Sequence, residues 1–333
     1  MNLVKTMWTK TLAEYFAAAS FGAVSIPSDA PQTNVLSSYV TIGCSGISSD
    51  GSTWSSRGPL DARNLRGWAE AADSVVAQRG IDLNEYQYRV YLMPTSVGLV
   101  SFGDTKEAFR PNNILRVWAA VLDTNVNAAN MAHELGHNLG LYHAQGYDDS
   151  GALVEYADAS CPMGSASQLA HYNAPSSVAL GWTTPQAVLR AADLPVGVWS
   201  TFKLRGLADS AVSSLQIFPG SWNSTWGDSD QLLVSFRRYT PTNADSGLQP
   251  QFRNKVQVHS LSPNYFGFGP SVLLAGALDD DTRAVWPRPG SAAPPDAASP
   301  QLVVRVLLVD EANGAAYVSL CRRAGGNGNS CAF

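Results

Sequence analysis

The sequence is poor in histidine, cysteine and charged residues, and it has no long hydrophobic run. Five of its 333 residues are histidines, four are cysteines, and charged residues make up 15% of the chain. The net charge of −5 leaves no basic excess for binding a nucleic acid, and no apolar run has the length of a membrane span. Because 45% of the residues are hydrophobic, the composition predicts a folded, weakly charged protein that is long enough for two domains.

Three of the five histidines fall within one short stretch. From His133 to His143 the sequence reads H-E-x-x-H-x-x-G-x-x-H. On a helix, His133 and His137 lie on one face and can bind one metal ion, while Glu134 is rotated away and can hold a water beside that ion. Gly140 tolerates a positive φ, so it can end the helix and bring His143 back as a third ligand. The alternative, an amphipathic helix with surface histidines, requires five fixed positions to coincide by chance.

The ligand set and its spacing favour one catalytic Zn²⁺. Three protein ligands leave the fourth position open for water, as catalytic zinc sites require. The signature is typical of the metzincin zinc proteases, which carry a methionine in a tight turn beneath the metal. Met163, between Pro162 and Gly164, is the candidate for that turn. We expect Met163 to pack rather than bind zinc, because a thioether is a poor zinc ligand; an ordinary core methionine is the alternative.

Helical and strand-like segments alternate over the first 182 residues. This order predicts α/β (α+β) layering with a mixed sheet and an active-site helix, that is, a metzincin-like catalytic domain. Helices are expected at residues 8–19, 61–79, 123–139 and 173–182, with Asp61 as the N-cap of the second and Asp123 or Thr124 as the N-cap of the third. Strands are expected at 22–27, 39–43, 86–93, 97–102 and 116–122.

The pattern changes near residue 197, after which short alternating or apolar segments are separated by Gly, Pro, Asn and Asp. This pattern of short segments separated by turn-forming residues is typical of an all-β sandwich-like domain. Strands are expected at residues 199–205, 211–218, 231–239, 255–261, 271–276 and 302–308, with a Pro- and Ala-rich loop at 286–301. The predicted organisation is a catalytic domain at 1–182, a linker at 183–196 and a C-terminal domain at 197–333.

The cysteines and one sequon favour a secretory route. Four cysteines suit two disulfides, although they allow three pairings. We predict that Cys321 pairs with Cys331 across a Gly- and Asn-rich stretch, which leaves Cys44 to pair with Cys161. Asn223 begins a sequon and is the candidate for glycosylation. Disulfides and glycans belong to secreted proteins, although no uninterrupted apolar signal segment stands at the N-terminus.

The chain resembles the gametolysin (autolysin) family, which are secreted zinc metalloproteases of green algae that digest the cell wall. The likeness is carried by the histidine motif, by residues 155–164 (EYADASCPMG) and 173–182, and more loosely by 232–238 and 256–259. It implies a metalloendopeptidase that acts outside the cell on hydroxyproline-rich matrix glycoproteins. By the same resemblance, residues 97–102 are the candidate edge strand for binding an extended substrate. We expect a monomer.

The resemblance also concerns the start of the chain. The family begins with a signal peptide, a pro-segment and a strand of the catalytic sheet, and none of these precedes the helical pattern at Trp8. We therefore expect the N-terminus to be truncated and the sheet to lack its first strand, with unpaired backbone groups that cost roughly 1–3 kcal/mol each if buried.

Hydrolysis is the chemistry that the motif predicts, with Glu134 as general base toward a zinc-activated water. Tyr172 is a candidate for holding the oxyanion, and a buried aromatic side chain is the favoured alternative. The acidic run at 279–281 could bind Ca²⁺, but a solvated turn fits it better. Two rival functions remain: a non-catalytic matrix-binding homologue, against which the intact Glu134 argues, and a zinc hydrolase of a non-peptide bond.

Overall fold

A computed structural model describes residues 6–27, 35–36, 38–94, 101–104, 114–121, 128–224, 226–263, 269–286, 300–325 and 331. The described residues form a mixed α/β structure with several sheets and few helices, as the sequence predicts at this coarse level. They divide into two compact units, Met1–Ala13 with Ile26–Gly140 and Glu14–Ser25 with Leu141–Phe333. None of the helices in the described ranges is long and apolar enough to cross a membrane.

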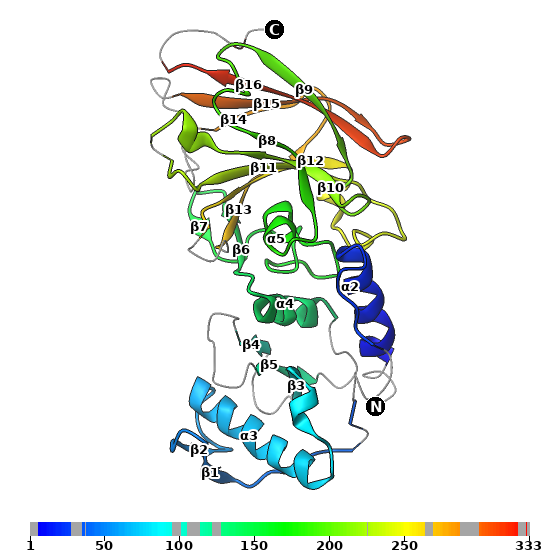
Figure 1. The fold of residues 1–333 in the computed structure, drawn as a ribbon, viewed down its shortest axis with the longest axis vertical. Helices are drawn as coiled ribbons and strands as arrows, with labels where there is room; N and C mark the ends of the chain where they lie inside the picture. The colour runs from blue at the N-terminus through cyan, green and yellow to red at the C-terminus, as the bar shows by residue number, and fades with distance from the viewer. Residues whose placement is uncertain are drawn as a thin grey trace. The chain divides into compact units, whose positions relative to one another are not determined.

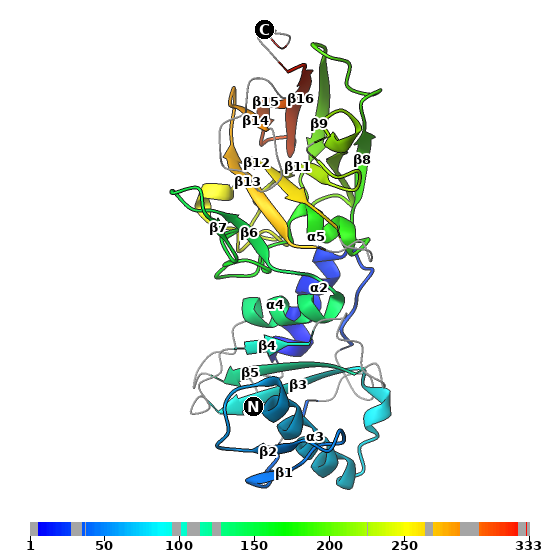
Figure 2. The ribbon, with the colours of Figure 1, turned by 90° about the vertical axis from the view of Figure 1, so that its left-hand side faces the viewer.

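The first unit is built around a three-stranded sheet in the order β3–β5–β4. Its elements are η1 (Met7–Leu12), β1 (Ser45–Ile47), β2 (Thr53–Ser55), α3 (Ala62–Gln78), η2 (Leu83–Glu85), β3 (Tyr88–Pro94), β4 (Ser101–Gly103), β5 (Leu115–Val121) and α4 (Ala128–Leu139). β3 runs parallel to β5, and β4 pairs antiparallel with the other side of β5. α3 and α4 lie on opposite faces of this sheet (Figures 1 and 2).

α3 covers its face of the sheet with an aromatic cluster. As expected, Asp61 caps the helix, because its carboxylate accepts a hydrogen bond from the Asn64 N–H at 2.8 Å. Leu65 and Trp68 pack with Trp118 of β5 in one buried cluster. The Trp118 indole also donates to the Leu65 carbonyl at 3.1 Å. This packing holds β5 in place for the helix on its other face.

In the part of the chain that the structure describes, the second unit contains two sheets and several short helices. Its helices are α2 (Ala13–Ala19), α5 (Ala174–Ala179), η4 (Pro219–Ser221) and η5 (Pro250–Phe252). The seven-stranded sheet has the order β7 (Leu153–Val154), β6 (Ala144–Tyr147), β13 (Ser271–Leu278), β12 (Lys255–Leu261), β11 (Gln231–Arg237), β10 (Val212–Ile217) and β8 (Thr184–Leu189). The four-stranded sheet has the order β14 (Arg283–Trp286), β15 (Gln301–Asp310), β16 (Ala315–Arg323) and β9 (Trp199–Arg205). Side chains from both sheets form one hydrophobic cluster.

Two of the strands predicted from the sequence are not found in the structure, so these predictions are wrong. Residues 22–27 and 39–43 lie in turns and loops, and no described strand pairs with either. A short extended segment has little stability without a neighbouring strand, so apolar residues alone do not make one. Residues 97–100, the expected cap at 123–124 and most of the loop at 286–301 lie outside the described residues.

The boundary between the compact units differs from the expected domain boundary. The units divide after Gly140, whereas the sequence places the end of the first domain at residue 182. The expected linker at 183–196 contains β8, which pairs in parallel with β10. β6 and β7, which follow the third histidine, belong to the seven-stranded sheet. The domain bounds drawn from the sequence stay a prediction.

The cysteines follow the prediction in one pair and depart from it in the other. Cys321 and Cys331 form a disulfide. Cys44 and Cys161 are free thiols, so the pairing expected between them is wrong. That expectation assumed that every cysteine is paired, whereas Cys161 is fully buried and its Sγ accepts a hydrogen bond from the Asn173 N–H at 3.4 Å. Burial raises the pKa of the Cys161 thiol to about 12, which makes it unreactive.

Candidate metal centre

α4 carries the first two histidines. Asn138, which follows the second of them, connects the helix to the sheet by hydrogen bonds. The rings of His133 and His137 lie one turn apart, with centroids separated by 4.8 Å. The buried Asn138 amide donates to the carbonyl of Asp104 at 2.6 Å and to that of Arg116 at 3.2 Å. Asp104 is the residue that follows β4, and Arg116 lies in β5. These two hydrogen bonds therefore fix the position of α4, which carries the histidines, relative to the sheet.

Gly140 turns the chain at the end of α4. Its φ is +104°, a conformation that side chains with a β-carbon rarely adopt, and its N–H donates to the His137 carbonyl at 2.9 Å. Beyond this turn the chain reaches His143. The candidate ligand nitrogens of His133, His137 and His143 all lie within 4.8 Å of one another. The structure thus brings together the three ligands that the sequence predicts.

The three imidazoles fit one transition-metal ion. Neutral imidazole nitrogens bind Zn²⁺ at about 2.0–2.1 Å, and nitrogens grouped this closely can reach a single ion. Within the described ranges, no other group of three His, Cys, Asp or Glu side chains is placed to hold a metal. The carboxylates of the acidic run at 279–281 are engaged by Lys255, Arg305 and the Val309 N–H, so the structure gives no support to a Ca²⁺ site there.

Glu134 is buried between its helix and the edge strand. Glu134 is 4% exposed. Burial raises the pKa of its carboxyl to about 7, although a hydrogen bond with Ser101 lowers that pKa in part. β4 approaches α4 closely at Gly103. A β-carbon placed there would lie 2.7 Å from the Glu134 carbonyl oxygen and 3.0 Å from its Oε2. Glycine therefore permits the contact that encloses Glu134.

We expect Gly103→Ala to displace Glu134. The added methyl group collides with helix backbone, which cannot rotate away, so the free energy of unfolding should fall by about 1–3 kcal/mol and catalytic turnover should fall with it. Urea unfolding and an activity assay measure the two effects. Gly43→Ala is the matched control, because a β-carbon at Gly43 meets only the Ser45 carbonyl at an ordinary 3.5 Å. Equal behaviour of the two variants would show that the approach of β4 to α4 does not matter.

The strand after His143 is tied to the turn that contains Met163. The Ala144 N–H donates to the Met163 carbonyl at 2.8 Å, and the Asp158 N–H donates to the Ala144 carbonyl at 3.3 Å. Met163 is fully buried, as the expected packing role requires. The position of the third histidine therefore depends on the segment 158–163.

A buried carboxylate organises this segment. Asp158 accepts hydrogen bonds from the Ser160 N–H at 3.0 Å and from Asn173 Nδ2 at 3.1 Å, and its Oδ2 lies 3.0 Å from His259 Nε2 on β12. Burial raises the pKa of Asp158, but the hydrogen bonds from its partners outweigh burial and lower it to about 2. Asp158 is therefore ionised and fully paired inside the second unit.

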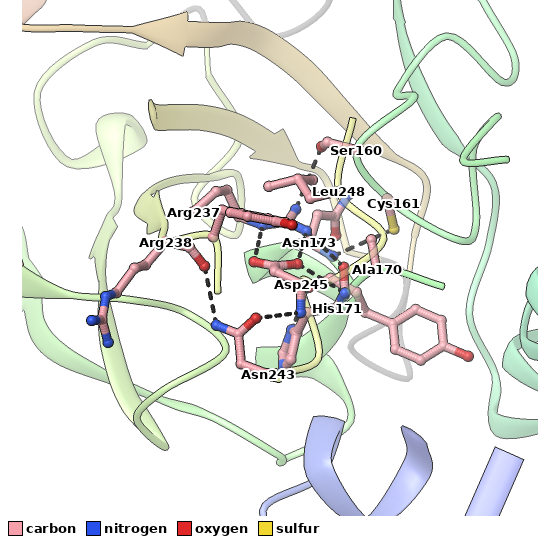
Figure 3. Close-up of polar contacts among 12 residues, drawn as sticks. Ser160, Cys161, Ala170, His171, Asn173, Arg237, Arg238, Asn243, Asp245 and Leu248 are labelled. Atoms are coloured by element: carbon pink, nitrogen blue, oxygen red, sulfur yellow. Dashed lines mark hydrogen bonds and ion pairs between the residues drawn. The ribbon is translucent and has the colours of Figure 1, made fainter. Parts of the chain in front are cut away.

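A second buried pair, formed by Arg237 and Asp245, is shown in Figure 3. The Arg237 guanidinium on β11 binds both oxygens of Asp245, at 2.9 and 2.5 Å, and both side chains are 0% exposed. Arg237 also donates to the His171 carbonyl at 3.0 Å, and Asp245 accepts from the His171 N–H at 2.9 Å. The contact between Asp158 and His259 and the ion pair between Arg237 and Asp245 thus connect strands of the seven-stranded sheet to residues 158–173.

Two other candidate residues, Tyr172 and Asn223, are buried. Tyr172 is fully buried, with its ring 5.5 Å from that of Trp182, and burial raises the pKa of its hydroxyl well above 10. The structure thus favours the alternative of a core aromatic over an oxyanion role. Asn223 is 4% exposed, and its Nδ2 donates to the Pro300 carbonyl at 3.0 Å. A glycan on Asn223 would have to break that bond, and the glycosylation site stays a prediction.

The sequence did not single out two residues that contact the third histidine. His143 Nδ1 lies 2.7 Å from Glu155 Oε1, and the ring of Tyr156 lies 4.2 Å from the imidazole. Both residues stand in the stretch EYADASCPMG that carries the family resemblance, but nothing in their spacing from His143 indicates a contact. A carboxylate shortly after a candidate ligand is the only signal that the sequence offers.

Two imidazoles on a helix, a third beyond a glycine turn and a buried glutamate beside the first define a site of the metallopeptidase class. A sequence model of the family described as gametolysin peptidase M11 matches residues 4–266. Because this match covers most of the chain, the protein belongs to that peptidase family, which confirms the resemblance. No curated protein and no solved structure matches the chain.

Proposed function

We propose that the chain is a zinc-dependent endopeptidase. The observation that carries the proposal is the group formed by His133, His137 and His143, with Glu134 buried next to the first of them. Membership in a peptidase family supports a peptide bond as the substrate. When bound, zinc supplies a water of lowered pKa and a Lewis acid for the substrate carbonyl.

The residues of the chain have separate tasks in this proposal. Glu134 takes the proton of the attacking water and delivers it to the leaving amine. Asn138 and Gly103 keep that carboxylate in place through the contacts of α4 with β4. β4 is an edge strand among the described residues, so an extended peptide can pair with it through main-chain hydrogen bonds.

The substrate class is a finer part of the same proposal. The family resemblance supports hydroxyproline-rich glycoproteins of an extracellular matrix or cell wall. The disulfide between Cys321 and Cys331 supports action outside the cell, because disulfides persist in oxidising compartments. Digestion of a proline-rich glycoprotein, with chelator, without it and after addition of Zn²⁺, tests the whole proposal. Release of glycans without peptide cleavage, or cleavage that a chelator does not affect, would contradict it.

His143→Ala should weaken zinc binding and leave α4 intact, because His143 stands beyond the turn that ends the helix. We expect one Zn²⁺ per unsubstituted chain and a substoichiometric amount in the variant after dialysis, measured by elemental analysis. Circular dichroism of both chains checks the helix content. If the variant retained zinc with the affinity of the unsubstituted chain, a site of three histidines would be wrong.

A further inference from the structure

The β6–β7 hairpin returns the chain to the third histidine. β6 begins directly after His143 and pairs antiparallel with β7. The turn between them is closed by the Asp148 carboxylate, which accepts hydrogen bonds from backbone N–H groups within the turn. β6 also pairs in parallel with β13, so the hairpin is part of the seven-stranded sheet. Glu155 and Tyr156, which follow β7, therefore lie beside His143 on a supported backbone.

These two residues contact different parts of the imidazole. The Glu155 carboxylate lies 2.7 Å from Nδ1, and the Tyr156 ring is tilted by 43° against the imidazole with the centroids 4.2 Å apart. The carboxylate engages one nitrogen and the phenol ring limits rotation of the imidazole. The His143 side chain is 22% exposed and that of Glu155 is 61% exposed. The contact is thus accessible to substitution without disturbing the core.

We propose that Glu155 is a positioning residue that holds the hydrogen of His143 on Nδ1 and leaves Nε2 to bind the metal. A neutral imidazole has one donor and one acceptor nitrogen, and an ionised carboxylate only accepts. The short contact with Glu155 therefore requires the donor to be Nδ1. A carboxylate in this position orients a metal-binding histidine and makes its other nitrogen a better ligand. The assignment of Nε2 to zinc rests on the proposed function, whereas the position of the hydrogen is a property of the chain itself.

Zinc affinity measures the effect on the ligand. In the full chain, Glu155→Ala should weaken zinc binding by about 10- to 100-fold, as measured by competition with a chromogenic chelator, and the unfolding midpoint should stay unchanged. Glu155→Gln keeps an acceptor oxygen and removes the charge, so its loss of affinity should be smaller. Asp149→Asn is the matched control, because it removes one exposed carboxylate from the turn of the same hairpin and should leave the affinity unchanged.

The position of the hydrogen can be read without any metal. Long-range ¹⁵N–¹H correlation spectra of the metal-free chain distinguish the two tautomers of each histidine, and His143→Ala assigns the His143 signals. We expect the Nδ1–H tautomer in the unsubstituted chain and in Glu155→Gln, and a mixture of tautomers in Glu155→Ala.

The outcomes separate this inference from the proposed function. Native zinc affinity in Glu155→Ala, an Nε2–H tautomer in the unsubstituted chain, or equal losses in Glu155→Ala and Asp149→Asn would each overturn the positioning role. If the unsubstituted chain showed the Nδ1–H tautomer but bound no zinc, the proposed function would fail while the role of Glu155 in setting the tautomer would stand.

Discussion

Glu134→Gln is expected to lower turnover by about 10²- to 10⁴-fold and to leave zinc bound, because general-base catalysis contributes this range and glutamine keeps the shape of the side chain without a basic oxygen. The amide can still accept the hydrogen bond that Ser101 offers, so the packing of β4 on α4 should survive. Initial rates on a peptide substrate at saturating concentration, together with elemental zinc analysis of the same sample, measure the two quantities.

Glu85→Gln provides the comparison for this substitution. Glu85 is an exposed glutamate at the end of η2, in the same unit as α4, and its replacement should leave turnover and zinc content unchanged. Activity of Glu134→Gln within a few-fold of this control would remove Glu134 from the mechanism. Loss of zinc together with loss of activity would assign Glu134 to holding the site together instead.

The part of the site that lies on one helix could be predicted because its geometry is local. A helix places His133 and His137 one turn apart whatever surrounds them, and Gly140 can adopt the positive φ that ends the helix. The prediction of Asp61 as a helix cap succeeded for the same reason, since a cap needs only its own first turn. None of these features requires knowledge of a distant contact.

The contact between Glu155 and His143 could not be predicted because it depends on distant pairing. β6 is only four residues long, and its sequence Ala-Gln-Gly-Tyr lacks the β-branched residues that indicate a strand. Its position is set by β13, where Ala144 pairs with Ser271 on a segment far along the chain. A sequence pattern reports periodicity within a segment and not which strand lies next to it.

The two arginines at the end of β11 show the same limit. Arg237 and Arg238 are neighbours of one chemical type, yet the first is fully buried against Asp245 and the second, with a side chain 31% exposed, pairs with Asp209. Arg237 is the last residue of β11 and is buried, whereas Arg238 lies just beyond the strand, so the end of the strand separates the two environments. The sequence contains no sign of which face is buried, because a buried charge is uncommon and its counter-charge lies on another segment.

Arg237→Met is expected to lower the free energy of unfolding of the second unit by about 3–5 kcal/mol, because it leaves the Asp245 carboxylate buried without a counter-charge. This loss is large against a typical net stability of about 5–15 kcal/mol. Adding Asp245→Asn to the same chain should recover part of the loss, since asparagine removes the orphaned charge and keeps an oxygen to accept the His171 N–H. Urea unfolding gives the free energy of unfolding of the unsubstituted full chain, of Arg237→Met and of the double variant.

Arg66→Met tests whether burial is the cause. Arg66 pairs with Asp50 at the surface, with side-chain exposures of 27% and 44%, so losing that pair should lower the free energy of unfolding far less than Arg237→Met does. The two substitutions remove the same charge and insert the same side chain, and they differ in whether water can solvate the carboxylate that remains. Two results would contradict this expectation: a loss of unfolding free energy in Arg237→Met no larger than that in Arg66→Met, or a further loss when Asp245→Asn is added. Either would show that the buried Asp245 carboxylate does not need Arg237 as its counter-charge. The strand β11 would then hold residues 158–173 through backbone and apolar contacts alone.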